Sequence, residues 1–215
     1  MQSISVYETD NNVTEELFTN IHKQWKETIN NNEEELEFKL FVNETVNEFK
    51  RCHIIYDEIK PLKARVFQTD IDELIVTNTY EAFINISTGL LIVFANKKSA
   101  DGIYNLIADS YKISYNKKLF DLKEIINQAT DVTRAQFRKL NIETINGSSL
   151  SGNQVTSTNV YQIMDGSGEL STVAVTYPYN NGEIKFSVSD VGSIVIFSTV
   201  EGLGVLDLIE LLLQL

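Results

Sequence analysis

Two stretches of this chain, about a hundred residues apart, share a pattern that restricts the fold more than any other feature. The first is FINISTGLLIVF, residues 83–94, and the second is FSVSDVGSIVIF, residues 186–197. Each has phenylalanine at both ends, glycine at its seventh position and then a run of aliphatic residues. Glycine tolerates the positive φ that a tight reversal needs, and a short aliphatic run is typical of a buried strand. The pattern therefore predicts two similar β-hairpins.

The similarity extends on both sides of these hairpins. Upstream, residues 65–77 and 161–176 each predict a strand, a polar turn and a second strand that begins at Glu-Leu. Downstream, each hairpin is followed by a predicted helix, at 99–111 and at 201–215. Each copy is therefore expected to be a strand meander followed by a helix.

Together these patterns predict the fold class. We expect an α+β fold whose antiparallel sheet is built from two similar strand-meander-plus-helix halves, an internal duplication, with the helices packed on the sheet. The first half, 1–115, includes an N-terminal helix, and the second half is 116–215. The two pseudo-repeated halves are expected to form a single domain, 1–215.

Shorter patterns predict the elements around the halves. Leu17, Ile21, Trp25 and Ile29 recur every four residues and predict the N-terminal helix, with Thr14 as its N-cap. Alternating apolar residues in 35–42 predict a half-buried strand, and the apolar positions of 119–129 predict a helix.

The connections are marked by turn residues. Pro61 is expected to end the element before it, and residues 43–62 are otherwise left unassigned. Asn181-Gly182 predicts a two-residue hairpin turn, and DGSG at 165–168 predicts another turn. The uncharged stretch 146–159 predicts a flexible loop.

Charge is distributed unevenly along the chain. The formal net charge is −12, yet residues 112–140 carry a net charge of +4. We call residues 112–140 the basic island. It supplies the candidate contacts to an anion or a nucleic acid, which are Lys117, Lys118, Arg134, Arg138 and Lys139. The favoured alternative is that these bases pair with the surrounding acidic residues. Because the rest of the chain repels phosphate, binding of nucleic acid is not expected.

Residues for catalysis or metal binding are scarce. Cys52 is the one cysteine, and the two histidines are His22 and His53. Neighbouring residues of a strand point to opposite faces, so Cys52 and His53 are not expected to pair as nucleophile and base. No glycine-rich phosphate-binding motif is present. The sequence therefore predicts no catalytic residue, no metal site and no cofactor.

The predicted C-terminal helix has an unusually wide apolar surface. Its polar residues Asp207, Glu210 and Gln214 share one narrow face, and nearly all other positions are aliphatic. One apolar surface is expected to cover the sheet. The second, with Leu208, Leu212 and Leu215, is either covered by the other half of the chain or forms a contact with a second copy or another protein. We expect the contact.

The resulting functional hypothesis is a non-enzymatic binding or regulatory protein that acts through protein–protein contacts, as a component of a bacterial or phage-encoded complex. The first alternative is a nucleic-acid-binding protein that uses the basic island, and the second is an enzyme whose site is not recognised from sequence. No signal peptide and no membrane segment are expected, and with a single cysteine a cytoplasmic location fits.

Overall fold

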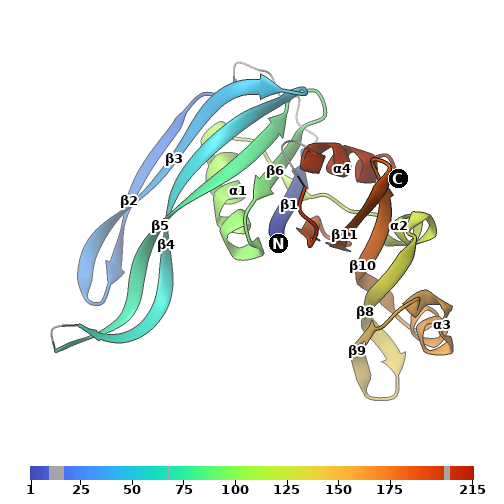
Figure 1. The fold of residues 1–215 in the computed structure, drawn as a ribbon. Helices are drawn as coiled ribbons and strands as arrows, with labels where there is room; N and C mark the ends of the chain where they lie inside the picture. The colour runs from blue at the N-terminus through green and yellow to red at the C-terminus, as the bar shows by residue number, and fades with distance from the viewer. Residues whose placement is uncertain (10–16, 67, 201–203) are drawn as a thin grey trace. The chain divides into compact units, whose positions relative to one another are not determined.

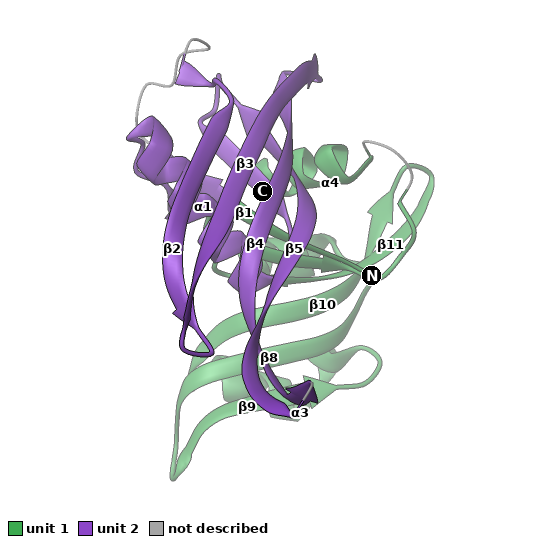
Figure 2. Ribbon diagram, turned by 90° about the vertical axis from the view of Figure 1, so that its left-hand side faces the viewer, with its two compact units in different colours: residues 1–6, 117–215 green, residues 7–116 purple. Residues whose placement is uncertain are grey.

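A computed structural model describes residues 1–9, 17–66, 68–200 and 204–215. The chain forms two compact units, which Figure 2 shows in separate colours. Unit 2 comprises residues 7–116, and unit 1 comprises residues 1–6 together with residues 117–215. The first strand, β1 (Gln2–Glu8), begins in unit 1 and ends in unit 2.

Unit 2 is an antiparallel meander covered by one helix (Figure 1). Its strands follow one another in space as they do in sequence, in the order β2-β3-β4-β5-β6. Its elements are β2 (Ile21–Ile29), β3 (Asn32–Val46), β4 (Phe49–Val66), β5 (Thr69–Asn85), β6 (Leu90–Phe94) and α1 (Lys97–Tyr111). The two-residue turn Asn30-Asn31 has φ values of 48° and 67°, which is the left-handed geometry that matches the twist of a hairpin.

Helix α1 closes the core of unit 2. The side chain of Asn96 caps its start by accepting a hydrogen bond from the main-chain N–H of Ser99. Ile103, Ile107 and Tyr111 lie along one face of the helix and are buried with apolar residues of the sheet. The helix predicted at 99–111 is confirmed, and it begins two residues earlier, at Lys97.

Unit 1 has a different strand order. Antiparallel pairing runs β12-β11-β10-β8-β9, and residues 2–5 of β1 pair with β12. The helices α2 and α3 pack against β10 and β8. The short strand β7 (Asn116–Lys117) begins in unit 2 and ends in unit 1. The later elements of unit 1 are α2 (Leu122–Gln128), β8 (Asp131–Ile142), β9 (Ile145–Ser151), α3 (Asn159–Asp165), β10 (Glu169–Tyr179), β11 (Gly182–Ser189), β12 (Ser193–Ile196) and α4 (Gly204–Leu213), with a 3₁₀ turn at Val155–Ser157.

The two predicted hairpins are present, and each has glycine where the chain needs it. Gly89 and Gly192 have φ values of 69° and 77°. A Cβ atom on Gly89 would lie 2.7 Å from the carbonyl oxygen of Thr9, and one on Gly192 would lie 2.5 Å from that of Val6. Both backbone conformation and space therefore require glycine.

The α+β class is confirmed, but the structure does not confirm the internal duplication. In the first hairpin Phe83 lies opposite Ile92, nine residues later, whereas in the second Phe186 lies opposite Ile196, ten residues later. The flanking strands differ as well. In unit 2 the second strand of the β2–β3 hairpin pairs with β4, whereas in unit 1 the first strand of the β8–β9 hairpin pairs with β10, and no helix among the described residues of unit 2 corresponds to α3. The resemblance therefore covers a hairpin followed by a helix, and the register differs even there.

The predicted N-terminal helix is wrong over the part that the structure describes. Residues 21–29 form β2, paired with β3 from Ile21↔Leu40 to Ile29↔Asn32, and Thr14 lies outside the described residues. A spacing of four residues fits about one turn of a helix, but it also equals two periods of the two-residue side-chain alternation in a strand. Ile21, Trp25 and Ile29 consequently share one face of β2.

Three further expectations need correction. Residues 146–159 form most of β9, the 3₁₀ turn and the start of α3 rather than a loop. Residues 161–165 are helical, so DGSG lies at the end of a helix instead of joining two strands. The turn between β10 and β11 is Asn180-Asn181, with φ values of 45° and 61°, one residue before the predicted pair. Asparagine tolerates the left-handed conformation that glycine was expected to supply.

Pro61 does not end β4. The strand continues to Val66, and its register against β5 shifts between Pro61 and Ala64. Proline is tolerated at such a bulge and on a strand edge without a neighbour, since no ladder hydrogen bond is lost there. Residues 43–62, unassigned from the sequence, form the end of β3, a two-residue turn and most of β4.

Candidate interaction surfaces

The leucines predicted to bind a partner lie on α4. Leu208 and Leu212 are 0% and 2% exposed, and Leu215 follows the helix and is partly exposed. The hydroxyl of Tyr179 on β10 donates a hydrogen bond to the carbonyl of Gly204 at the start of this helix, at 2.6 Å. The folded chain itself covers Leu208 and Leu212, so these two side chains are not available on its surface.

The basic island does not form a continuous basic surface. Arg138 on β8 donates hydrogen bonds to Glu169 at 3.2 Å and to Asp190 at 2.5 Å, and Lys139 pairs with Glu169 at 2.9 Å. These contacts hold the pKa of Glu169 below its ordinary value, with the Lys139 hydrogen bond as the largest cause. Arg138 and Lys139 are therefore neutralised within unit 1, as the favoured alternative expected.

The other three bases of the island lie apart from this cluster. Arg134 is exposed on β8, and its guanidinium donates to the hydroxyl of Ser151 at 3.3 Å. Lys117 and Lys118 are half-buried at β7, where the main-chain N–H of Lys118 donates to Val6. The structure thus does not bring the five candidate residues together into one anion-binding site.

A groove of about 590 Å³ lies beside the ion pairs in unit 1. Phe120, Leu122 and Leu170 are among its apolar lining residues. Its charged lining residues are Asp121, Asp165, Glu169 and Asp190 against Lys123 alone. Asp190 Oδ1 is buried and has no hydrogen-bond partner among the described residues. Four carboxylates facing one lysine disfavour a phosphate group in this groove.

We predict that the protein does not shift duplex DNA in a gel assay at about 150 mM salt, because few phosphates could be neutralised against a net charge of −12. Arg134→Ala combined with Arg138→Ala should leave this result unchanged. Submicromolar binding by the wild type that is lost in the double variant would contradict the prediction and favour the nucleic-acid alternative.

A largely buried carboxylate occupies the face of unit 2 on which α1 lies. Glu58 on β4 has a side chain only 10% exposed. It accepts hydrogen bonds from the hydroxyl of Ser99 on α1 at 2.5 Å, from that of Tyr80 on β5 at 2.8 Å, and from the amide of Asn78 at 2.6 Å. We call these four residues the Glu58 network. It ties the start of α1 to two strands of the sheet.

The Glu58 network has the residue types of a catalytic site but not its accessibility. Ser99 is 3% exposed, so a substrate cannot reach its hydroxyl. Burial raises the pKa of Glu58, but the hydrogen bonds from Ser99, Tyr80 and Asn78, with the charge of Lys60, outweigh it and lower the pKa below 4.5. Burial also raises the pKa of Tyr80 to about 12. The carboxylate is thus held ionised as a structural anchor.

We predict that Glu58→Gln lowers the free energy of unfolding by about 1–3 kcal/mol at pH 7, because an amide accepts fewer strong hydrogen bonds than a carboxylate. Since the folded pKa lies below the ordinary 4.5, the stabilisation by Glu58 is complete above 4.5 and is lost as the pH falls through the folded pKa. Urea unfolding from pH 7 to pH 3 measures this. The difference in the free energy of unfolding between wild type and variant should become smaller as the pH falls. A difference that stays constant from pH 7 to pH 3 would show that the charge of Glu58 does not stabilise the fold.

The side chains of Cys52, His53 and His22 lie apart from one another in the described part of unit 2. Cys52 is buried and His53 is exposed, so they lie on opposite faces of β4, as predicted. Burial raises the pKa of the Cys52 thiol to about 12, which leaves it unreactive. His22 on β2 lies 2.7 Å from Glu37 on the sheet surface. Among the described residues, no group of three or more metal-binding side chains could hold an ion.

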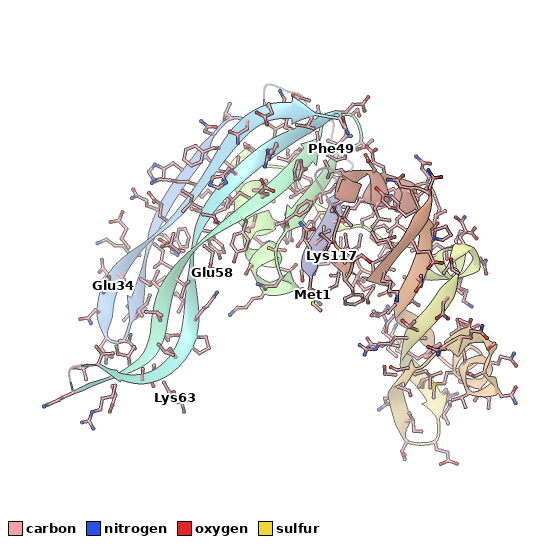
Figure 3. The ribbon with its side chains drawn as sticks, in the orientation of Figure 1. Met1, Glu34, Phe49, Glu58, Lys63 and Lys117 are labelled. Carbon is pink, nitrogen blue, oxygen red and sulfur yellow. The ribbon has the colours of Figure 1, made fainter. Side chains whose placement is uncertain are left out.

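Beyond the Glu58 network, β4 and β5 continue as a two-stranded ribbon. The pairing of β4 with β3 ends at Tyr56, and that of β5 with β6 ends at Glu81. From Asp57 to Val66 the first strand pairs only with β5, from Thr77 back to Thr69. We call residues 57–66 and 69–77 the ribbon. Figure 3 shows Glu58 where the ribbon leaves the sheet and Lys63 farther along it.

The ribbon carries uncovered apolar side chains. Side chains of β4 alternate up to Pro61, so Glu58 and Lys60 share the face that meets α1. Leu74 lies opposite Lys60, and Leu62 follows two residues after Lys60, at the start of the register shift between Pro61 and Ala64. Leu62 and Leu74 are 42% and 45% exposed. Sequence reasoning missed this pair, because its members lie twelve residues apart and only the register brings them together.

A second contact holds the ribbon in place. The side chain of Asn30, in the β2–β3 turn, accepts hydrogen bonds from the main-chain N–H groups of Asp72 and Glu73, at 2.9 and 3.2 Å. It also donates to the carbonyl of Glu73 at 2.8 Å. An isolated two-stranded hairpin is only marginally stable in water. The Asn30 contacts and the Glu58 network therefore fix the ribbon and its exposed leucines.

No protein-family model matches this chain, and no curated protein is significantly similar to it. None of the helices in the described part of the chain is long and apolar enough to cross a membrane.

Proposed function

We propose that this chain is a non-enzymatic binding protein that acts through protein–protein contacts, and that the ribbon of unit 2 is its contact surface. The observation that carries the proposal is the pair Leu62 and Leu74, exposed on a ribbon that two sets of hydrogen bonds hold in place. Neighbouring exposed leucines on a fixed element lose little conformational entropy when a partner covers them. Such apolar surface is characteristic of an interaction site.

The chemistry around the leucines defines the partner surface. Lys60 lies opposite Leu74 and two residues before Leu62, and its ammonium is 3.5 Å from the carboxylate of Glu58. Exposed Lys97 and Lys98 begin the helix whose first turn contacts Glu58. The partner surface is accordingly apolar at its centre with carboxylates at its rim. The leucines of α4 are left out of this proposal because Leu208 and Leu212 are buried.

The setting of this protein is part of the proposal. We propose a cytoplasmic component of a larger bacterial or phage-encoded complex, since the single cysteine is buried and the chain is strongly acidic. The nucleic-acid alternative is less favoured because Arg138 and Lys139 are paired with carboxylates. The enzyme alternative is less favoured because the buried serine of the Glu58 network is inaccessible.

The proposal is tested by affinity purification from the source organism. We predict that a protein captured by the tagged wild type is depleted about tenfold or more by Leu62→Glu combined with Leu74→Glu, because two carboxylates would be buried at the interface. Quantitative mass spectrometry measures the depletion. The matched control is Leu119→Glu in unit 1, at a leucine that is 68% exposed.

The control variant should retain the captured protein, and all three proteins should unfold at similar temperatures because the substituted side chains are exposed. A photo-crosslinking amino acid in place of Lys63 should form a covalent adduct with the same protein. Equal capture by the ribbon variant and the wild type, or an adduct from position 119 in place of position 63, would contradict the proposal.

A further inference from the structure

The outer edge strand of unit 1 lacks the charged residues and the proline that often protect exposed sheet edges. β9 pairs with β8 and ends the strand order, so its other edge has no neighbour among the described strands. Its sequence, INGSSLS, contains no charged residue and no proline. Its register against β8 shifts near its start, between Arg138 and Ile142, and is regular from Gly147 to Ser151. Natural proteins block free edges with lysine, proline or bulges, because unpaired main-chain groups bind other strands. An uncharged edge is therefore a site at which an additional strand can pair.

The hydrogen-bonding pattern identifies the free main-chain groups. The N–H of Gly152 donates to the carbonyl of Thr133 on β8 at 3.0 Å. In an antiparallel pair such bonds occur at every second residue. The register Arg134↔Ser151 and Gln136↔Ser149 then directs the N–H and C=O groups of Gly147, Ser149 and Ser151 away from β8. These three residues present alternating donors and acceptors to an incoming strand.

Arginine on the neighbouring strand indicates which partner fits. Arg134 shares a sheet face with Ser149 and Ser151, and its guanidinium has the Ser151 hydroxyl as its one partner in the described part of the chain. An added strand lies about 10 Å from β8, within reach of an arginine side chain across small residues. Serine and glycine leave that path open. A carboxylate on this face of the incoming strand would pair with Arg134.

The opposite face of the added strand meets apolar surroundings. Leu150 of β9 lies opposite Ala135, and Ser148 lies opposite Phe137, whose ring packs on Tyr161 of α3 at 5.4 Å. Helix α3 therefore lies on this face. Val160 and Ile163 of α3 are 48% and 60% exposed. Apolar residues of an incoming strand on this face would have an apolar neighbour.

We propose that β9 is a docking edge for an extended segment of another protein, in which carboxylate and aliphatic residues alternate. A second copy of β9 does not fit this description. β9 has no acidic residue, so a pair of β9 strands would place two Arg134 guanidinium groups on one face without a carboxylate. A seven-residue strand also buries too little surface to hold a stable dimer by itself. This site is separate from the ribbon and does not depend on the function proposed for it.

The test uses a probe peptide, acetyl-Thr-Val-Glu-Val-Glu-Val-Thr-amide, and the full-length ¹⁵N-labelled protein. We predict saturable chemical-shift changes confined to β8, β9 and α3, with a dissociation constant on the order of 100 μM. The same peptide with lysine in place of glutamate should bind about tenfold more weakly. Arg134→Ala should remove most of the difference in affinity between the glutamate peptide and the lysine peptide.

Two variants separate main-chain pairing from side-chain contact. Ser149→Pro removes an outward N–H and leaves the bonds to β8 in place, so binding should weaken about tenfold or more. The matched Ser149→Val keeps the N–H and should bind as the wild type does. A peptide N-methylated at alternate residues lacks the N–H groups that would pair with β9. It tests main-chain pairing with the wild-type protein, even if Ser149→Pro does not fold.

Three results would overturn the proposal. They are no binding of the glutamate peptide at about 1 mM, equal binding of the N-methylated and parent peptides, and a wild-type dimer that Ser149→Pro abolishes. The last result would assign the edge to a second copy of the chain.

Discussion

The carboxylate of Glu58 is the interaction on which the architecture of unit 2 depends. Three hydrogen bonds reach it from β5 and α1, so one side chain fixes the start of the helix and the point where β4 and β5 leave the sheet. A buried carboxylate is costly unless it is fully hydrogen-bonded. Here the donors lower its pKa despite burial, and the charge is held in place. The exposed leucines of the ribbon have a fixed position because of this anchor.

The free edges of the two units are treated in opposite ways. β2, at the edge of unit 2, carries His22, Lys23, Lys26 and Glu27, a pattern that discourages strand pairing. β9, at the edge of unit 1, has no charge. This contrast between two edge strands of one chain supports the proposal that β9 pairs with a strand of another protein. We therefore propose that the protein has two contact surfaces, one made by side chains of the ribbon and one by the main chain of β9.

Local signals predicted local structure well, and they failed where tertiary pairing decides. Gly89 and Gly192 marked two hairpins because only glycine fits their φ and their surroundings. The spacing of Ile21, Trp25 and Ile29 suited helix and strand equally, and pairing with β3 decided between them. β9 resembled a loop because serine and glycine have weak strand propensity. Glu58 and Ser99 are 41 residues apart, so no local pattern could reveal their contact. The excess of acidic residues in the sequence predicted that Arg138 and Lys139 pair with carboxylates. Their partner Glu169 is 31 and 30 residues away, respectively, so only the folded structure could identify it.

We propose that the ribbon is already ordered as a contact surface before any partner binds. Amide hydrogen exchange of the purified protein, measured residue by residue, tests it most directly. We predict strong protection at the Glu58 network, intermediate protection along residues 57–66 and 69–77, and extra protection around Leu62 and Leu74 when the captured partner is added. Exchange of the whole ribbon at the rate of an unfolded chain, or no change there on addition of the partner, would contradict it.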